Sequence, residues 1–241
     1  VGEARGEYLL FLSADIGIVQ KDWLNLLLNH AQRPEVGIVG AKLLTKEGRT
    51  ESGALVAGLT GVSGTTFAGS DANDAGYMNR LQIDQNCCLV SADCMMLEKE
   101  LFVRLGGFDG LLPDSLAEAD FCLRVSQAGR LNIWSPRALV MRLSVSSGEE
   151  VKSEVSSGGG VQYSRAIEIV YDRWTPQLAH DPSYNRNLSL SGAGFEVEQR
   201  IDLSWQPQKL LDQKTTLVYP ADQWGCGHYR IMQPIEAMKA Q

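Results

Sequence analysis

GGFDGLLPDSLAEADFCLR, residues 106–124, joins a glycine-rich turn to the start of a helix and carries Glu118 and Asp120. YLLFLSAD, residues 8–15, is a short apolar run that ends at Asp15. A continuous apolar run of this length is typical of a buried parallel strand. Each stretch therefore places carboxylates where the chain changes direction, and together they indicate both the fold and a site.

Strand patterns and helix patterns alternate on both sides of these stretches. Apolar runs predict buried strands at 8–12, 36–41, 86–97 and 131–134, the last leading into Pro136. Helical spacing and end signals predict helices at 23–32, 98–105, 116–128 and 161–174. A turn at Glu47-Gly48 within 42–56 predicts a hairpin, and the polar segment 58–80 predicts a long mobile loop. This alternation predicts an α/β layered sheet.

The composition is that of an ordinary soluble protein and argues against several classes. The chain has 241 residues, 44% hydrophobic and 21% charged, and its net charge of -7 with no basic cluster argues against nucleic-acid binding. No apolar run approaches the roughly 20 residues that span a membrane. The five cysteines lack paired Cys-x-x-Cys spacing, which indicates buried free thiols in a reducing compartment and not a zinc site.

The composition changes twice after the last predicted strand. Residues 144–160 are rich in Ser, Gly, Glu and Lys, as in a linker, and residues 176–207 read as an irregular tail that wraps a surface. A new strand–loop–helix pattern begins at residue 215, and a lone strand and helix cannot bury both faces of a sheet. We therefore expect a first domain at 1–148, a linker and tail at 149–214, and the start of a second domain at 215–241.

Asp15 follows the first apolar strand directly. Ligands of open α/β sheets bind beyond the carboxyl ends of the strands. A carboxylate there can bind a divalent cation, and that cation can neutralise a diphosphate leaving group. The alternative is that Asp15 only caps the turn into the next segment.

Glu118 and Asp120 are two residues apart on a predicted helix, so they point to different faces and should not share one role. Ser115 to Glu118 is also a capping-box sequence, in which the glutamate would bond to the Ser115 amide. The helix dipole would keep Glu118 ionised. Arg124 stands four residues after Asp120 and can pair with it.

These two stretches resemble the GT-A fold glycosyltransferases of the family 2 type. Residues 6–24 resemble the segment that carries the Asp-x-Asp motif, with Asp15 matching the acid that reaches the metal and Ser13 standing where the first acid usually stands. In EADFCLR, the resemblance implies that Glu118 is the general base. Asp120 matches the acidic residue that follows the base in the family, and the resemblance implies that it too is a catalytic residue. Ala117 departs from the pattern, in which another Glu precedes the base.

The resemblance also implies an acceptor-binding turn. Gly106, Gly107, Phe108 and Asp109 match the family's acceptor-side turn, where glycine lets the backbone approach a ligand. The alternative is a turn that only ends the preceding helix, which Gly106 also satisfies. Asp93 lies inside an apolar run and either lines the acceptor cleft or caps a neighbouring element.

Arg142 stands where the family usually has a histidine that completes the metal site. Arginine cannot ligate a cation, but it can neutralise a diphosphate directly. An exchange of the metal for an arginine is one hypothesis, and a plain surface arginine at a strand end is the alternative.

The resemblance covers about residues 1–148 and implies a Rossmann-like mixed sheet flanked by helices that lacks its first βαβ portion, while residues 218–234 resemble the opening of a GT-B glycosyltransferase. It implies inverting transfer of a sugar from a nucleotide-diphosphate donor, with Mg²⁺ or Mn²⁺, to a hydroxyl of a glycan or lipid-linked acceptor. The setting would be bacterial cell-envelope polysaccharide synthesis, in the cytoplasm or at the cytoplasmic face of the inner membrane. Because Ser13, Ala117 and Arg142 depart from the pattern, the alternative is a non-catalytic glycan- or partner-binding scaffold.

Overall fold

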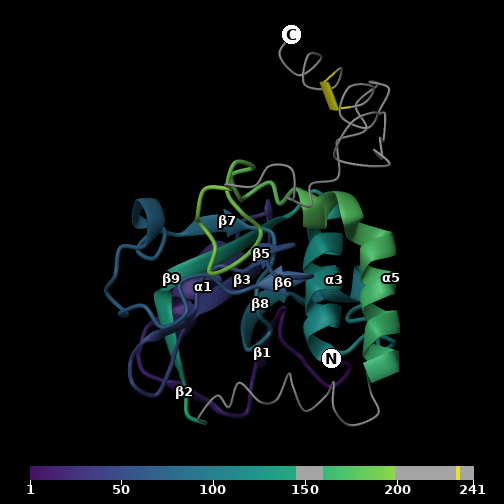
Figure 1. The fold of residues 1–241 in the computed structure, drawn as a ribbon. Coiled ribbons are helices and arrows are strands. Elements are labelled where there is room, and N and C mark those ends of the chain that lie inside the picture. Colours follow the sequence, from purple (N-terminus) through teal and green to yellow (C-terminus); the bar gives the residue numbers. More distant parts are fainter. Residues whose placement is uncertain (145–159, 199–231, 234–241) are drawn as a thin grey trace. The chain divides into compact units, whose positions relative to one another are not determined.

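The computed structural model describes residues 1–144, 160–198 and 232–233 (Figure 1). The chain divides into two units, 1–207 and 208–241, and the elements given below belong to the first. Most of the second domain expected at 215–241 therefore lies outside the described residues, as do parts of the linker expected at 149–214. These boundaries stay predictions.

The described part of the chain forms a mixed sheet with helices on both faces. The strands of this part are β1 (Tyr8–Leu12), β2 (Ile16–Ile18), β3 (Val36–Leu44), β4 (Thr50–Ser52), β5 (Val56–Ala57), β6 (Ser63–Gly64), β7 (Gln85–Cys87), β8 (Cys94–Glu98) and β9 (Leu131–Arg142). Among these described strands, β5 and β6 pair only with each other, in a separate two-stranded sheet. The helices of this part are α1 (Trp23–Ala31), the short 3₁₀ helix η1 (Tyr77–Asn79), α2 (Lys99–Arg104), α3 (Asp114–Gln127) and α5 (Gly160–Ala179).

The main sheet has seven strands in the order β1-β8-β3-β9-β2, with β4 added to β3 and β7 to β9. Only β3 and β9 run parallel among these described pairs, and the other pairs are antiparallel. The predicted α/β class, a mixed sheet flanked by helices, is confirmed.

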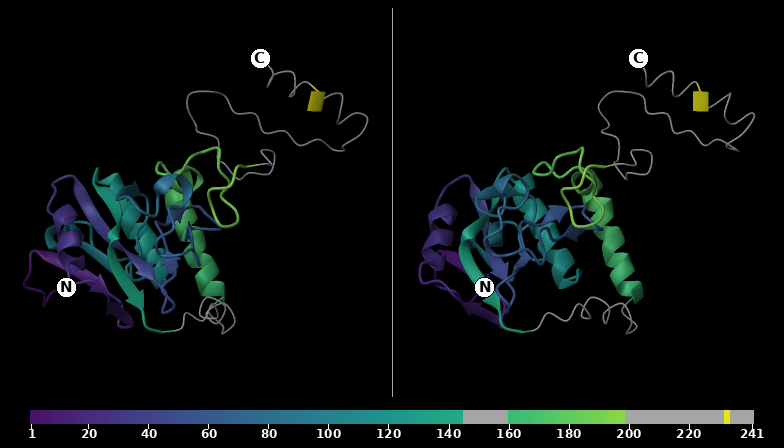
Figure 2. Two further views of the ribbon diagram at one scale, coloured as in Figure 1. Left: turned by 90° about the vertical axis from the view of Figure 1, so that its left-hand side faces the viewer. Right: turned by 60° about the vertical axis from the view of Figure 1, so that its left-hand side comes forward.

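Both faces of the sheet are buried, because helices cover each side. Neighbouring residues of each central strand point to opposite sides and so pack against different helices. On β3, Ile38 packs on the side of α2, α3 and α5, whereas Val39 packs on the side of α1. On β8, Met95 and Met96 divide between the two sides in the same way. Figure 2 shows the sheet between α1 and the pair α3 and α5.

The first strand differs from its prediction. β1 pairs antiparallel with β8 at the edge of the described sheet, and Leu10 and Leu12 are 36% and 39% exposed. The prediction of a buried parallel strand is therefore wrong, because an apolar run does not show whether a strand has one neighbour or two.

The run 86–97 is two strands and not one. β7 pairs with β9, whereas β8 pairs with β1 and β3, so the chain must cross between different parts of the sheet. The six residues 88–93 make this crossing, and they carry Ser91 and Asp93 to the end of the sheet.

The ninth strand is longer than predicted. β9 continues through Pro136 to Arg142, and its pairing with β3 shifts where the partner of Ala41 is Ser135 and the partner of Lys42 is Leu139. Proline is tolerated at such an irregularity because no ladder hydrogen bond is needed from its nitrogen. The longer strand carries Arg142 to a position opposite Ile16 of β2.

The predicted hairpin at 42–56 is confirmed, with Leu43 opposite Ser52 in β3 and β4. The helix predicted at 161–174 extends to Ala179 as α5 and includes Pro176, so the first residues assigned to the tail are helical. Residues 180–198 then follow an irregular course, and Tyr184 and Leu188 pack against Val56 and Leu59. None of the described helices has the length and apolar character needed to cross a membrane.

Candidate functional site

A cleft of about 640 Å³ opens where several strand ends and one helix start meet. The turn after β1 contributes Asp15, the β3–β4 hairpin contributes Glu51, and the crossing before β8 contributes Asp93. The first turns of α3 contribute Glu118, and the end of β9 contributes Arg142. Four of the predicted site residues, Asp15, Asp93, Glu118 and Arg142, therefore meet in one place.

Arg142 lies among three carboxylates. Its Nη1 donates to Asp15 Oδ2 at 2.9 Å, its Nε to Glu51 Oε1 at 2.6 Å, and its Nη2 to Asp93 Oδ2 at 2.8 Å. The Arg142 side chain is 15% exposed. Although burial opposes it, the hydrogen bonds to Asp15 and Glu51 raise the pKa of Arg142 above its usual range. The four groups together carry a formal charge of -2.

Asp15 has a second partner, the Ser144 hydroxyl, which donates to its Oδ2 at 2.5 Å. This bond, followed by those from Arg142, lowers the pKa of Asp15. The backbone also fixes the pair, because Ile16 is opposite Arg142 in the β2–β9 ladder and the Leu143 amide donates to the Asp15 carbonyl at 2.8 Å. Asp15 is thus fixed against Arg142 through both its side chain and its backbone. It does more than cap the turn into the next segment.

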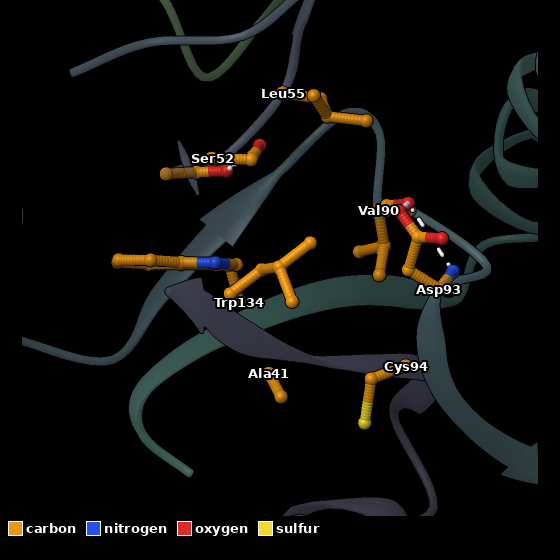
Figure 3. A pocket seen from close by; sticks show the side chains of 10 residues that line it. Ala41, Ser52, Leu55, Val90, Asp93, Cys94 and Trp134 are labelled. Carbon is orange, nitrogen blue, oxygen red and sulfur yellow. Dashed lines mark hydrogen bonds between the residues drawn. The ribbon is translucent and has the colours of Figure 1, made fainter. Parts of the chain in front are cut away.

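Asp93 joins the turn after β1 to the crossing before β8. Its carboxylate accepts hydrogen bonds from Ser13 Oγ at 2.8 Å and Ser91 Oγ at 2.9 Å, and its carbonyl accepts one from the Ser13 amide at 3.0 Å. A small cavity of about 20 Å³ adjoins the cleft and shares Asp93 and Val90 with it. Figure 3 shows these two side chains together with Trp134, which also lines the cavity. Ser13 therefore orients a carboxylate in place of supplying one.

Glu118 faces the cleft and accepts a hydrogen bond from the Ala92 amide at 3.1 Å. Burial raises its pKa to about 7, the charges of Asp93 and Asp114 add to the rise, and the Ala92 bond opposes it. The expectation that the helix dipole keeps Glu118 readily ionised is therefore wrong. The capping-box alternative is wrong as well, because the glutamate bonds to Ala92 and not to Ser115.

Asp120 lies on the other side of α3, away from the cleft, and is 1% exposed. Its carboxylate accepts hydrogen bonds from Arg124 Nε at 2.7 Å, Trp174 Nε1 at 2.9 Å and Arg173 Nη1 at 3.2 Å. The predicted pairing with Arg124 is confirmed. The geometry does not support a catalytic role for Asp120, because its bonds join α3 to α5.

The turn at 106–109 also lies outside the residues that line the cleft. The Gly106 and Gly107 amides donate to the carbonyls of Val103 and Phe102 and so end α2. This is the alternative prediction, a turn that only ends the preceding helix. The ring of Phe108 packs against Phe11, Phe102 and Phe121, with centroids 5.1–5.3 Å apart.

Asp109, the last residue of this turn, accepts a hydrogen bond from Arg173 Nη1 at 2.8 Å. The same Arg173 nitrogen reaches Asp120, so the turn belongs to the contact between α3 and α5. The structure therefore does not support acceptor binding by Gly106, Gly107, Phe108 or Asp109.

Glu51 and Ser144 are the site residues that the sequence analysis missed. Glu51 lies on a three-residue strand, and only the fold of the hairpin brings it to Arg142. Ser144 was assigned to a linker. Its position depends on the length of β9, which extends to Arg142, whereas the sequence predicted a strand that ends at residue 134.

The arrangement allows a test of the expected Mg²⁺ or Mn²⁺ site. Asp15, Glu51 and Asp93 each already accept a hydrogen bond from Arg142, whose guanidinium occupies the point where they converge. Across the described residues, no group of three or more His, Cys, Asp and Glu side chains has the geometry to hold a metal ion. As arranged, these residues do not fit a divalent cation.

Sequence comparison relates the chain to two longer proteins. It is 35% identical over 197 residues to the uncharacterized protein y4gI of Sinorhizobium fredii, which covers 81% of this chain and 21% of that protein. It is 32% identical over 196 residues to the O-antigen biosynthesis protein RfbC of Myxococcus xanthus, which covers 78% of this chain and 14% of that protein. The chain spans about a fifth and about a seventh of the length of these relatives.

No protein-family model matches the chain. Among solved structures, the mannosyltransferase PcManGT of Pyrobaculum calidifontis, in complex with GDP-Man and Mn²⁺, has a TM-score of 0.44 and 15% identity. That match covers 76% of this chain and 46% of the mannosyltransferase chain.

Proposed function

We propose that the chain belongs to a GT-A, family 2-type glycosyltransferase that moves a sugar from a nucleotide-diphosphate donor to a hydroxyl of a glycan acceptor. The observation that carries the proposal is the place of Glu118, a carboxylate with a pKa of about 7 in the wall of a cleft at the end of the sheet. A general base works best when its pKa lies near the operating pH. The similarity to an O-antigen biosynthesis protein supports an assignment to polysaccharide synthesis.

In the proposed reaction, Glu118 takes the proton of the acceptor hydroxyl. The acceptor oxygen then bonds to the anomeric carbon of the donor, and the bond from that carbon to the diphosphate breaks with its electron pair leaving on the nucleoside diphosphate. One displacement of this kind inverts the anomeric centre. The Ala92 amide engages one oxygen of Glu118, Oε2, and we assign the proton to the other.

The charge of the cleft favours a neutral acceptor. Asp15, Glu51, Asp93 and Glu118 supply carboxylates, whereas Arg142 supplies the positive charge and already pairs with three of them. Hydroxyl groups of a neutral sugar can donate to such carboxylates, but a polyanion would be repelled. We therefore assign the acceptor to this cleft, and the predicted contact of Arg142 with the donor diphosphate remains part of the proposal.

The other features remain part of the proposal. The donor would be a nucleotide sugar, the acceptor a glycan or lipid-linked glycan, and the place the cytoplasm or the cytoplasmic face of the inner membrane. A glycan-binding scaffold without catalysis is the second candidate, because Arg142 satisfies the acids that would otherwise meet a metal.

Release of nucleoside diphosphate from UDP-, GDP- and dTDP-sugars, with and without neutral oligosaccharide acceptors, tests the proposal. We expect release with one class of donor, and at least a tenfold faster release when an acceptor is present. A folded protein that binds oligosaccharides in calorimetric titrations, yet releases no nucleotide from any donor, would contradict transfer and favour the scaffold.

A further inference from the structure

We propose that Arg142 stands in for a divalent cation, so that the cleft needs neither Mg²⁺ nor Mn²⁺ at Asp15. The geometry alone indicates that no such cation binds. That transfer proceeds without added metal rests, in addition, on the proposed function.

The guanidinium of Arg142 bonds to three separate partners. Three different nitrogens of Arg142 each reach a different carboxylate, at 2.6–2.9 Å. These carboxylates come from the turn after β1, from β4 and from the crossing before β8. One side chain thus joins three segments that are distant in the sequence, as a bound cation does when it gathers oxygen ligands.

The backbone holds Arg142 in this position. Arg142 ends β9 opposite Ile16, and the amide of Leu143 donates to the Asp15 carbonyl at 2.8 Å. The side chain begins beside Asp15 and is 15% exposed. Its place among the acids therefore follows from the strand pairing and is not the chance position of a surface arginine.

The guanidinium also neutralises part of the charge of the cleft. Without it, Asp15, Glu51 and Asp93 would be three like charges at one point, and like charges at such distances repel strongly in a partly buried site. With it, an incoming divalent cation meets a fixed positive charge and oxygens that already accept hydrogen bonds. Arginine has no acceptor and cannot become a ligand itself. The guanidinium and the metal are therefore mutually exclusive occupants.

Manganese binding measures this exclusion directly. Mn²⁺ is titrated into the protein, and the free ion is followed by electron paramagnetic resonance, for the wild type, Arg142→His and Arg142→Ala. We expect the wild type to show no stoichiometric site up to about 1 mM Mn²⁺, and both variants to bind one ion at least tenfold more tightly. Adding Asp15→Asn to Arg142→His should remove the gained site.

Arg137→Ala is the matched control, because Arg137 pairs with Asp84 and does not line the cleft. It should bind Mn²⁺ as the wild type does. Folded Arg142 variants that gain no affinity would overturn the proposal. If those variants do not fold, the wild type still decides: a stoichiometric Mn²⁺ site that Asp15→Asn abolishes would overturn the proposal, and its absence would support it.

Transfer without added metal is measured separately as nucleotide release by the wild type with EDTA and with Mn²⁺. Rates within twofold of each other support it, and loss of release in EDTA that Mn²⁺ restores overturns it. If the protein transfers no sugar under any condition, the proposed function is wrong. The Mn²⁺ titration does not depend on transfer and still tests whether Arg142 excludes the cation.

Discussion

Replacing Glu118 with glutamine is expected to lower kcat for sugar transfer by about 10²–10⁴-fold. Glutamine has the shape of glutamate and keeps an oxygen for the Ala92 amide, but it cannot take a proton from an acceptor hydroxyl. The loss should therefore appear in kcat, with the affinity for the acceptor nearly unchanged. Nucleotide release at saturating donor and acceptor measures it.

Glu35→Gln is the matched control, since Glu35 is exposed and lies outside the residues that line the cleft. It should retain the wild-type rate. Circular dichroism and thermal unfolding show whether each variant keeps its fold. A folded Glu118→Gln protein with a rate within twofold of the wild type would remove Glu118 as the base.

Replacing Asp120 with alanine is expected to lower the free energy of unfolding by about 3–5 kcal/mol. The carboxylate is 1% exposed and accepts hydrogen bonds from Arg124, Trp174 and Arg173. Its removal leaves a partly buried guanidinium and a buried indole N–H without this acceptor, which costs more than the pair contributes when intact. Denaturant unfolding followed by tryptophan fluorescence measures the change.

Asp109→Ala is the control for Asp120. Asp109 shares Arg173 with Asp120, but the side chains of Asp109 and Arg173 are 22% and 42% exposed, so this variant should lose only about 1 kcal/mol. If Asp120→Ala kept the stability of the wild type and lost only its transfer activity, Asp120 would be catalytic, as the sequence resemblance implied.

The sequence predicted the layers of the fold better than the pairing of its strands. Apolar runs and helix-end signals located most elements, because burial on two faces leaves a clear local pattern. That pattern does not contain the identity of the neighbouring strand. It therefore missed that β1 is at an edge and antiparallel, and that the run 86–97 divides into β7 and β8.

The same limit applies to the site. Asp15 and Glu118 could be singled out because each stands at the end of an element with a recognisable sequence around it. Glu51 could not, because its role depends on a hairpin folding back onto the end of β9. The role of Asp120 was misjudged for a related reason, since nothing near it in the sequence shows that Trp174 and Arg173 pack over it.

The raised pKa of Glu118 is the property that best supports its proposed role as the general base. A glutamate in water titrates near 4.5, and the buried Glu118 titrates at about 7. The base form is therefore lost as the pH falls through 7, whereas an unperturbed glutamate would stay ionised down to about pH 5. The free protein should show this loss in kcat/KM, which reports ionisations of the unliganded state.

The pH dependence of kcat/KM for sugar transfer, measured from pH 5.5 to 8.5, tests most directly whether Glu118 is the base of an active site. We predict a rate that rises about tenfold per pH unit below pH 7 and levels off above it, with the rise absent in Glu118→Gln. A wild-type profile that is flat across this range, or a Glu118→Gln profile that keeps the same rise, would contradict it.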